Sequence, residues 1–139
     1  MPALLHHALA TYGGAMRAAL AKAGYDDIPK NGLYVIGGLA LAGDHPLGEL
    51  IGQLRLSKQA AGQLVDTLVE RGYLQRDVDA EDRRRLRVAL SARGRAAAKV
   101  QSAARIRIDE RLAERVGEKN VECTRRVLSA LIQIGRELK

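Results

Sequence analysis

The feature that most restricts the fold of this chain is the stretch LSKQAAGQLVDTLVERGYLQRDVDAEDRRRLRVALSARG, residues 56–94, in which the apolar periodicity changes from helical to strand-like. In its first part, apolar residues recur at the spacing of one helix face: Ala61, Leu64, Val65 and Leu68. Ser57 precedes them and is a typical N-cap, and Gly72 follows them, where a helix end favours a residue that tolerates positive φ. The pattern predicts a helix over residues 57–71.

The second part of the stretch predicts a two-stranded hairpin. Residues 73–78 have strand character, and residues 86–90 alternate between apolar side chains and Arg or Ala. About seven polar residues join the strands, more than a tight turn contains. Three acidic residues and then three arginines occupy this link: Asp79, Glu81, Asp82, Arg83, Arg84 and Arg85. Ser91 is placed to cap the helix that follows.

The rest of the chain has helical periodicity. We expect one helix from about Ala3 to Ala23, a second from near Pro29 to Gly43, and a short third over about 47–54. After the hairpin, we expect a long helix over 92–116 and a last one over about 119–138. The expected fold is mainly α with a small β-hairpin.

Two short helices joined by a tight turn and followed by a two-stranded ribbon form a winged helix-turn-helix, a DNA-binding unit. We expect residues 29–106 to form this lobe, with a wing at 78–86. Residues 1–28 and 107–139 are expected to be dimerisation helices, within one intertwined domain, because their apolar faces need a partner. The alternative is that both faces fold back onto the same subunit.

The second helix of such a unit enters the major groove, so its DNA-facing side lies opposite its apolar stripe. Lys58, Gln59, Gly62 and Gln63 lie on that side, with Asp66 near its edge. Glutamine can form paired hydrogen bonds with adenine, and lysine can donate to guanine or phosphate. Gly62 either allows close approach to DNA or is a weak point on a solvated face.

The three arginines of the link have a matching interpretation. A hairpin beside this second helix, the recognition helix, places its tip over the minor groove. Arginine is the side chain that enters this narrow, negative groove best. The neighbouring acidic residues are then salt-bridge partners that hold one arginine in place. Taken alone, such a charge run is more often a solvated loop.

The charge distribution agrees with an anionic partner. The net charge is +7, and residues 55–105 contain 12 Lys/Arg against 6 Asp/Glu. Aromatic residues make up only 3% of the chain, which disfavours single-stranded nucleic acid and membrane-surface binding, because both rely on aromatic side chains. The chain shows no signal peptide or membrane span, so we expect a cytoplasmic protein.

Residues 46–95 resemble the core of the multiple antibiotic resistance regulator (MarR) family. The residues that carry the resemblance are Leu56-Ser57-Lys58, Leu64-Val65-Asp66, Glu70-Arg71-Gly72, Asp82-Arg83-Arg84, and Val88, Leu90, Ser91 and Gly94. The chain departs from the common pattern at residues 60–63, Ala-Ala-Gly-Gln, so an operator sequence cannot be transferred from relatives. The flanking helices match only in number, length and amphipathic character.

The resemblance implies a homodimeric transcription regulator, usually a repressor, on a pseudo-palindromic operator of double-stranded DNA. It places Ser57, Lys58, Gln59 and Gln63 at the major groove, Arg83 or Arg84 at the wing tip, and Asp82 beside that arginine. Arg85 completes the basic run.

The resemblance also implies release of DNA by a small phenolic or aromatic acid. Tyr12, Arg17 and Tyr34 are our candidates to line its site; the alternative, that they are ordinary core or surface residues, stays open. Cys123, the single cysteine, is expected to be a half-buried thiol in the last helix.

Catalysis has little support in the sequence. His6 and His7 are adjacent, so they point about 100° apart on a helix and cannot share a metal ion. We expect neither enzyme activity nor a metal or cofactor. Two other functions stay open: a protein that coats DNA with little sequence preference, and an adaptor for a protein partner.

Overall fold

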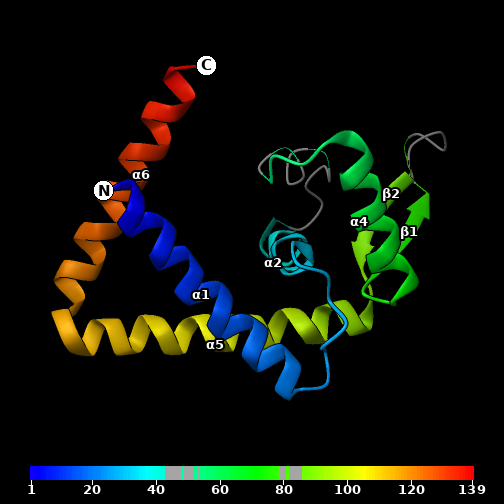
Figure 1. Ribbon diagram of the computed structural model, residues 1–139, viewed down its shortest axis with the longest axis horizontal. Helices are drawn as coiled ribbons and strands as arrows, with labels where there is room; N and C mark the ends of the chain where they lie inside the picture. Colours follow the sequence, from blue (N-terminus) through cyan, green and yellow to red (C-terminus); the bar gives the residue numbers. More distant parts are fainter. Residues whose placement is uncertain (43–47, 49–51, 53, 79–80, 82–85) are drawn as a thin grey trace. The chain divides into compact units, whose positions relative to one another are not determined.

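The computed structural model describes residues 1–42, 48, 52, 54–78, 81 and 86–139. Its elements follow in the order α1 (Pro2–Lys22), α2 (Gly32–Ala42), α4 (Lys58–Glu70), β1 (Leu74–Val78), β2 (Leu86–Leu90), α5 (Ala92–Val116) and α6 (Glu118–Glu137) (Figure 1). The expected fold class, mainly helical with one antiparallel hairpin, is confirmed. The short helix expected over 47–54 lies mostly outside the described residues, of which Gly48 and Gly52 are helical.

Two sequence-based predictions are wrong. Helix α2 begins at Gly32 and not near Pro29, because the Pro29 carbonyl accepts from the Gly32 amide at 2.8 Å and closes a turn there. A Cβ atom at Gly32 would lie only 2.9 Å from the Ile28 side chain and 3.0 Å from the Leu68 side chain of α4. Any larger residue would therefore crowd the start of α2. Cys123 is exposed in the single chain and not half-buried.

Helix α4 follows its sequence signals closely. The Ser57 side chain accepts a hydrogen bond from the Ala60 amide at 3.1 Å, so it caps the helix as predicted. The predicted apolar stripe is buried: Ala61, Leu64, Val65 and Leu68. Gly72, with a φ of 81°, reverses the chain directly into β1.

The hydrophobic core gathers side chains from most of these elements. Its buried members are Met16 and Leu20 of α1, Leu33, Val35, Ile36 and Leu39 of α2, Leu64, Val65 and Leu68 of α4, Tyr73, Leu74, and Ala97, Ala98 and Ala104 of α5. The α5 contribution consists of alanines, which allow the helix backbone to approach closely. Within this packing, the buried Gln101 side chain of α5 donates to the Leu33 carbonyl at 2.8 Å and so fixes α5 to α2.

The start of α5 is fastened to the chain just beyond α4. The Ser91 amide donates to the Tyr73 carbonyl at 3.0 Å, and the Ser91 hydroxyl donates to the Gly72 carbonyl. That hydroxyl also accepts from the Gly94 amide at 3.0 Å, which confirms the predicted cap. A Cβ atom at Gly94 would lie 2.0 Å from the Tyr73 carbonyl oxygen, so only glycine fits there.

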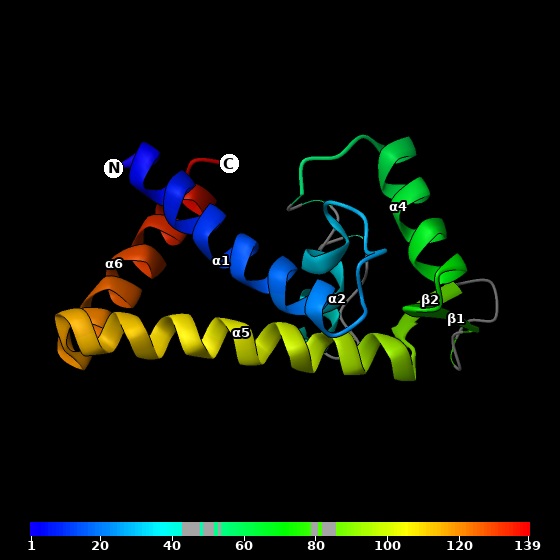
Figure 2. The ribbon, with the colours of Figure 1, turned by 60° about the horizontal axis from the view of Figure 1, so that its bottom comes forward.

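The chain divides into two compact units, residues 1–104 and 105–139. Helix α5 is unbroken and contributes to both units (Figure 2). In the second unit, Arg125 of α6 pairs with Asp109 of α5 and with Glu122, each at 3.6 Å. The division into dimerisation helices and a DNA-binding lobe stays a prediction.

We expect the Gly94→Ala substitution to destabilise the protein by about 3 kcal/mol, because the new methyl group overlaps backbone that cannot easily move. Its melting temperature should fall by roughly 10 °C, which calorimetry would measure. Gly62→Ala is the matched control, since no atom lies within 4 Å of the Gly62 Cβ position. The control should be as stable as the wild type or more stable. Equal melting temperatures for both variants would contradict the packing described at Gly94.

Candidate nucleic-acid interface

The exposed side of α4 presents the residues that the sequence assigns to the major groove. Ser57, Lys58, Gln59, Gly62 and Gln63 are all exposed, whereas the opposite side of the helix is buried in the core. Open space surrounds the Gly62 Cβ position. A surface of donors and acceptors on a helix of this kind can reach base edges and phosphates in a major groove.

A hollow of about 500 Å³ adjoins this surface. It is lined by the first two turns of α4, part of β1 and the described residues before α4: Gly48, Gly52, Leu56, Lys58, Ala61, Gly62, Val65, Asp66 and Arg76. Charged side chains from α4 and β1 therefore face a single depression.

An ion pair joins α4 to the hairpin beside that hollow. The Arg76 guanidinium donates to the Asp66 carboxylate, and both side chains are largely exposed. Arg76 has the strand parity of the buried Leu74, so it lies on the ribbon face that turns toward α4. Arg76 was not among the residues predicted from the sequence. Leu74, two residues earlier in the same strand, was the sequence signal from which the face of Arg76 could have been predicted.

The hairpin itself pairs as expected. Strands β1 and β2 are antiparallel, with Leu74 opposite Leu90 and Val78 opposite Leu86. The predicted tip residues Arg83, Arg84 and Arg85 and their acidic partner Asp82 lie outside the described residues. Their roles stay predictions.

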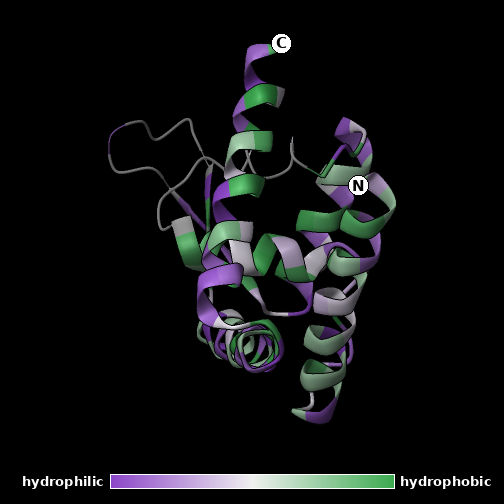
Figure 3. Cartoon of the chain, turned by 90° about the vertical axis from the view of Figure 1, so that its left-hand side faces the viewer, coloured by the Kyte–Doolittle hydropathy of each residue, from purple (hydrophilic) through white to green (hydrophobic). Residues whose placement is uncertain are grey.

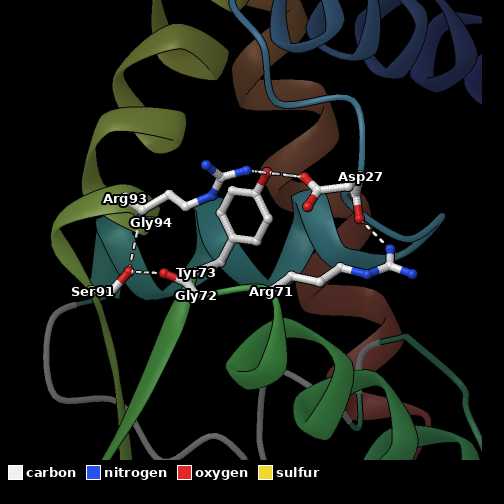
Figure 4. A network of polar contacts seen from close by, with 7 residues as sticks. All are labelled: Asp27, Arg71, Gly72, Tyr73, Ser91, Arg93 and Gly94. Atoms are coloured by element: carbon white, nitrogen blue, oxygen red, sulfur yellow. Dashed lines mark hydrogen bonds and ion pairs between the residues drawn. The ribbon is translucent and has the colours of Figure 1, made fainter.

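A polar cluster at the C-terminal end of α4 was not predicted from the sequence (Figure 4). The Tyr73 hydroxyl donates to the Asp27 carboxylate and accepts from Arg93 at 3.0 Å. Arg93 also pairs with Asp27 at 3.3 Å, and Arg71 donates to the Asp27 backbone carbonyl. Partners up to 66 residues apart in the sequence leave no local pattern from which this cluster could be predicted.

The cluster changes the acidity of its members. Burial raises the pKa of Tyr73 to about 12, and the hydrogen bond to Asp27 acts in the same direction. The hydrogen bond from Tyr73 lowers the pKa of Asp27 below its usual value. The pKa of Arg93 is raised, mainly by its hydrogen bond with Tyr73. At neutral pH the cluster therefore holds a neutral phenol between a carboxylate and a guanidinium.

Two of the three candidate effector residues lie together. The Cβ position of the buried Gly13 is 3.2 Å from the Tyr34 hydroxyl and 3.2 Å from the Arg17 guanidinium, so these two groups meet over α1. Tyr12 and Tyr34 are both half-buried and pack against the core. A phenol and a guanidinium side by side can bind a carboxylate.

Among the described residues, no His, Cys, Asp and Glu side chains gather as metal ligands do. None of the described helices combines the length and the apolar character that crossing a bilayer requires.

Helices α2 and α4 and the antiparallel hairpin follow in the order of a winged helix-turn-helix, and comparisons with known proteins agree in fold. Residues 27–85 match the sequence profile of the MarR family. FabT of Streptococcus pneumoniae, solved in complex with DNA, is 18% identical, covers 99% of this chain and 96% of its own, and has a TM-score of 0.80. The apo form of wild-type MarR from E. coli is 19% identical over 94% of this chain and 96% of its own, with a TM-score of 0.69.

A MarR family protein of Mycobacterium tuberculosis, solved in complex with salicylic acid, is 25% identical. It covers 94% of this chain and 95% of its own, with a TM-score of 0.65. No protein with a curated description matches the chain in sequence. Residues 27–85 thus resemble the MarR family in sequence, and the chain shares the fold of solved proteins of that family.

The raised pKa of Tyr73 predicts a loss of stability at alkaline pH. The phenol in the unfolded chain titrates near pH 10, before the folded one at about 12. The stability that the protonated phenol contributes is complete below pH 10 and is lost as the pH rises through 12. The difference in unfolding free energy between wild type and Tyr73→Phe should therefore shrink over this window, as denaturant titrations at several pH values would show.

Ile36→Val is the control, because it alters the same core without removing a titratable group. Its difference from the wild type should stay constant with pH. If the difference in unfolding free energy between wild type and Tyr73→Phe were equally constant with pH, the Tyr73 phenol would have the same pKa in the folded and unfolded chain.

Proposed function

We propose that this protein is a homodimeric, sequence-specific DNA-binding repressor of transcription that acts in the cytoplasm and is released from DNA by a small aromatic acid. The observation that carries the proposal is the exposed face of α4, with Lys58, Gln59, Gly62 and Gln63 beside the antiparallel hairpin. Residues 55–105, which contain both, also hold twice as many basic as acidic residues.

Direct reading of bases is assigned to the middle of this face. Gln63 supplies a paired donor and acceptor that fit the adenine edge, and Lys58 reaches guanine or phosphate. Gly62 lets the helix backbone approach the groove. The arginines at 83–85 are assigned to the minor groove beside it, with Asp82 as support. FabT, which shares the fold, was solved with DNA bound, and this supports the same mode of binding here.

Dimerisation is supported by the apolar stripe of α6, which we define as Val127, Leu131, Ile134 and Leu138. These residues repeat at intervals of four, three and four along the helix, and each is at least 45% exposed in the single chain. Figure 3 shows hydrophobic and hydrophilic segments alternating along α6. Exposed apolar residues at coiled-coil spacing favour burial against a second copy.

The effector proposal is supported by the juxtaposition of Arg17 and Tyr34 over Gly13. A guanidinium can bind the carboxylate of an aromatic acid, and a phenol can donate a second hydrogen bond. Tyr12, one residue before Gly13 on α1, is assigned to the ring of the ligand. The relative from Mycobacterium tuberculosis was solved with salicylic acid, a ligand of this class.

Fluorescence anisotropy on the duplex upstream of the protein's own gene tests the DNA-binding proposal. We expect this duplex to bind about a thousandfold more tightly than a random duplex at physiological salt. Gln63→Ala should change the sequence preference with little effect on the salt dependence. Replacing Arg83 and Arg84 together by Ala should weaken binding to both duplexes and reduce the salt dependence, because contacts to the minor groove and to its phosphates are lost.

Salicylate added to the same titration tests the effector. It should weaken binding of the wild type and have less effect on Arg17→Ala. The same assay distinguishes the two alternative functions. If the random duplex binds as tightly as any duplex selected from a random library, the protein coats DNA without sequence preference. If the intact dimer binds no duplex, it is an adaptor for another partner.

A charge placed in the apolar stripe of α6 should separate the subunits. Leu131→Glu is expected to shift the protein from dimer to monomer in analytical ultracentrifugation, because a buried carboxylate without a partner is costly. Ser129→Glu adds the same charge to the exposed opposite side of the helix and should leave the dimer intact. A Leu131→Glu protein that remains fully dimeric would place the interface elsewhere.

A further inference from the structure

We propose that Tyr73 is a positioning residue for DNA binding: its hydroxyl, held between Asp27 and Arg93, fixes the orientation of the recognition helix α4 relative to the segment between α1 and α2 and to the start of α5. The inference rests on the proposed function, because it concerns how the two recognition helices of a dimer are spaced. It assigns a role to a cluster that lies on none of the surfaces proposed to contact DNA or effector.

The cluster connects four segments of the chain (Figure 4). Asp27 lies between α1 and α2, and Arg71 is the C-cap of α4. Tyr73 leads from α4 into β1, and Arg93 belongs to the first turn of α5. Contacts with Asp27 therefore tie the end of the recognition helix and the start of the wing to the segment that follows α1.

The Tyr73 side chain is fully buried, which makes its hydroxyl group informative. A buried hydroxyl is costly unless it is hydrogen-bonded, so a phenyl ring could fill the same space with no such requirement. This hydroxyl both donates to Asp27 and accepts from Arg93. Hydrogen bonds are directional, and two of them at one atom restrict the tilt of the segment in a way that apolar packing does not.

Aromatic contacts limit the remaining freedom. The Arg93 guanidinium carbon lies 4.7 Å from the centre of the Tyr73 ring and 5.4 Å from that of Tyr25. The two rings meet edge to face at 6.2 Å. On the other side of Tyr73, its carbonyl accepts from the Ser91 amide and lies against Gly94. Both the side chain and the backbone of Tyr73 are thus held by the start of α5.

This position determines what the cluster can control. A dimer reads a palindrome only if its recognition helices are about 34 Å apart, one turn of DNA. In the proposed dimer, α1 and the far end of α5 lie in the dimerisation part, whereas α4 lies in the groove. The angle at which α4 is held to the α1–α2 segment and to the start of α5 therefore enters the spacing. If this angle is less firmly fixed, the dimer should also bind half-sites that are wrongly spaced.

The experiment compares duplexes that carry the same half-sites at the selected spacing and with one base pair added between them. The wild type should prefer the selected spacing. Tyr73→Phe, which keeps the ring and removes the hydroxyl, should reduce that preference by about fivefold, with unchanged base preference within each half-site. Ile36→Val, a core variant without a polar group, is the control for lost stability and should keep the wild-type preference.

The Asp27→Asn variant is a second test, because simple electrostatics and the positioning role predict different results for it. It makes the protein more positive, so simple electrostatics predicts tighter binding to every duplex and no change in spacing preference. Positioning predicts a reduced spacing preference even where binding to random DNA becomes tighter. A spacing preference retained in both Tyr73→Phe and Asp27→Asn would overturn the positioning role and leave the proposed function intact. A wild type that selects no operator would overturn the proposed function itself.

Discussion

The buried hydroxyl of Tyr73 is the constraint on which the arrangement of the winged-helix unit depends. Because the ring is fully buried, its hydroxyl must find partners inside the protein, and it finds them in the α1–α2 segment and in α5. Gly72 directs the chain to this point with a positive φ, and Ser91 returns it there after the hairpin. The recognition helix, the wing and α5 therefore converge on a single residue.

This convergence separates the parts that hold the fold from the parts that can meet DNA. The buried side of α4 is apolar and belongs to the core, while its exposed side carries Lys58, Gln59 and Gln63. The Asp66–Arg76 ion pair ties the hairpin to α4 on that exposed side. Such an exposed pair adds little to stability. Its effect is to keep a cation of the hairpin close to the recognition surface.

The local patterns predicted the elements well, for a physical reason. Ser57 and Ser91 cap helices through contacts with residues three positions away, so the signal is contained in a few residues. The alternation after Leu86 likewise belongs to one strand, in which Val88 and Leu90 are half-buried and Arg87 is exposed. The start of α2 was predicted three residues too early because the Pro29 carbonyl and the Gly32 amide close a turn before the helix begins.

The candidate site also contains residues that could be predicted from the sequence and residues that could not. The exposed residues of α4 could be predicted from helical periodicity, since the exposed side of the helix lies opposite its apolar stripe. The Asp27–Tyr73–Arg93 cluster could not be predicted, because its partners come from three separate segments and each residue alone is ordinary in its context. Arg76 was missed because charge on a strand predicts exposure but not the face that it occupies. Its spacing of two residues from the apolar Leu74 was the sequence signal for that face.

The close approach at Gly94 has a consequence for genetics. A Cβ atom there would overlap the Tyr73 carbonyl, so every substitution of this glycine damages the joint between α5 and the recognition helix. In a selection for cells that have lost regulation, changes at codon 94 should therefore recur beside those in α4, although Gly94 is buried and contacts no DNA in the proposed complex. A map of such alleles would outline the mechanical support of the recognition helix as well as its binding surface.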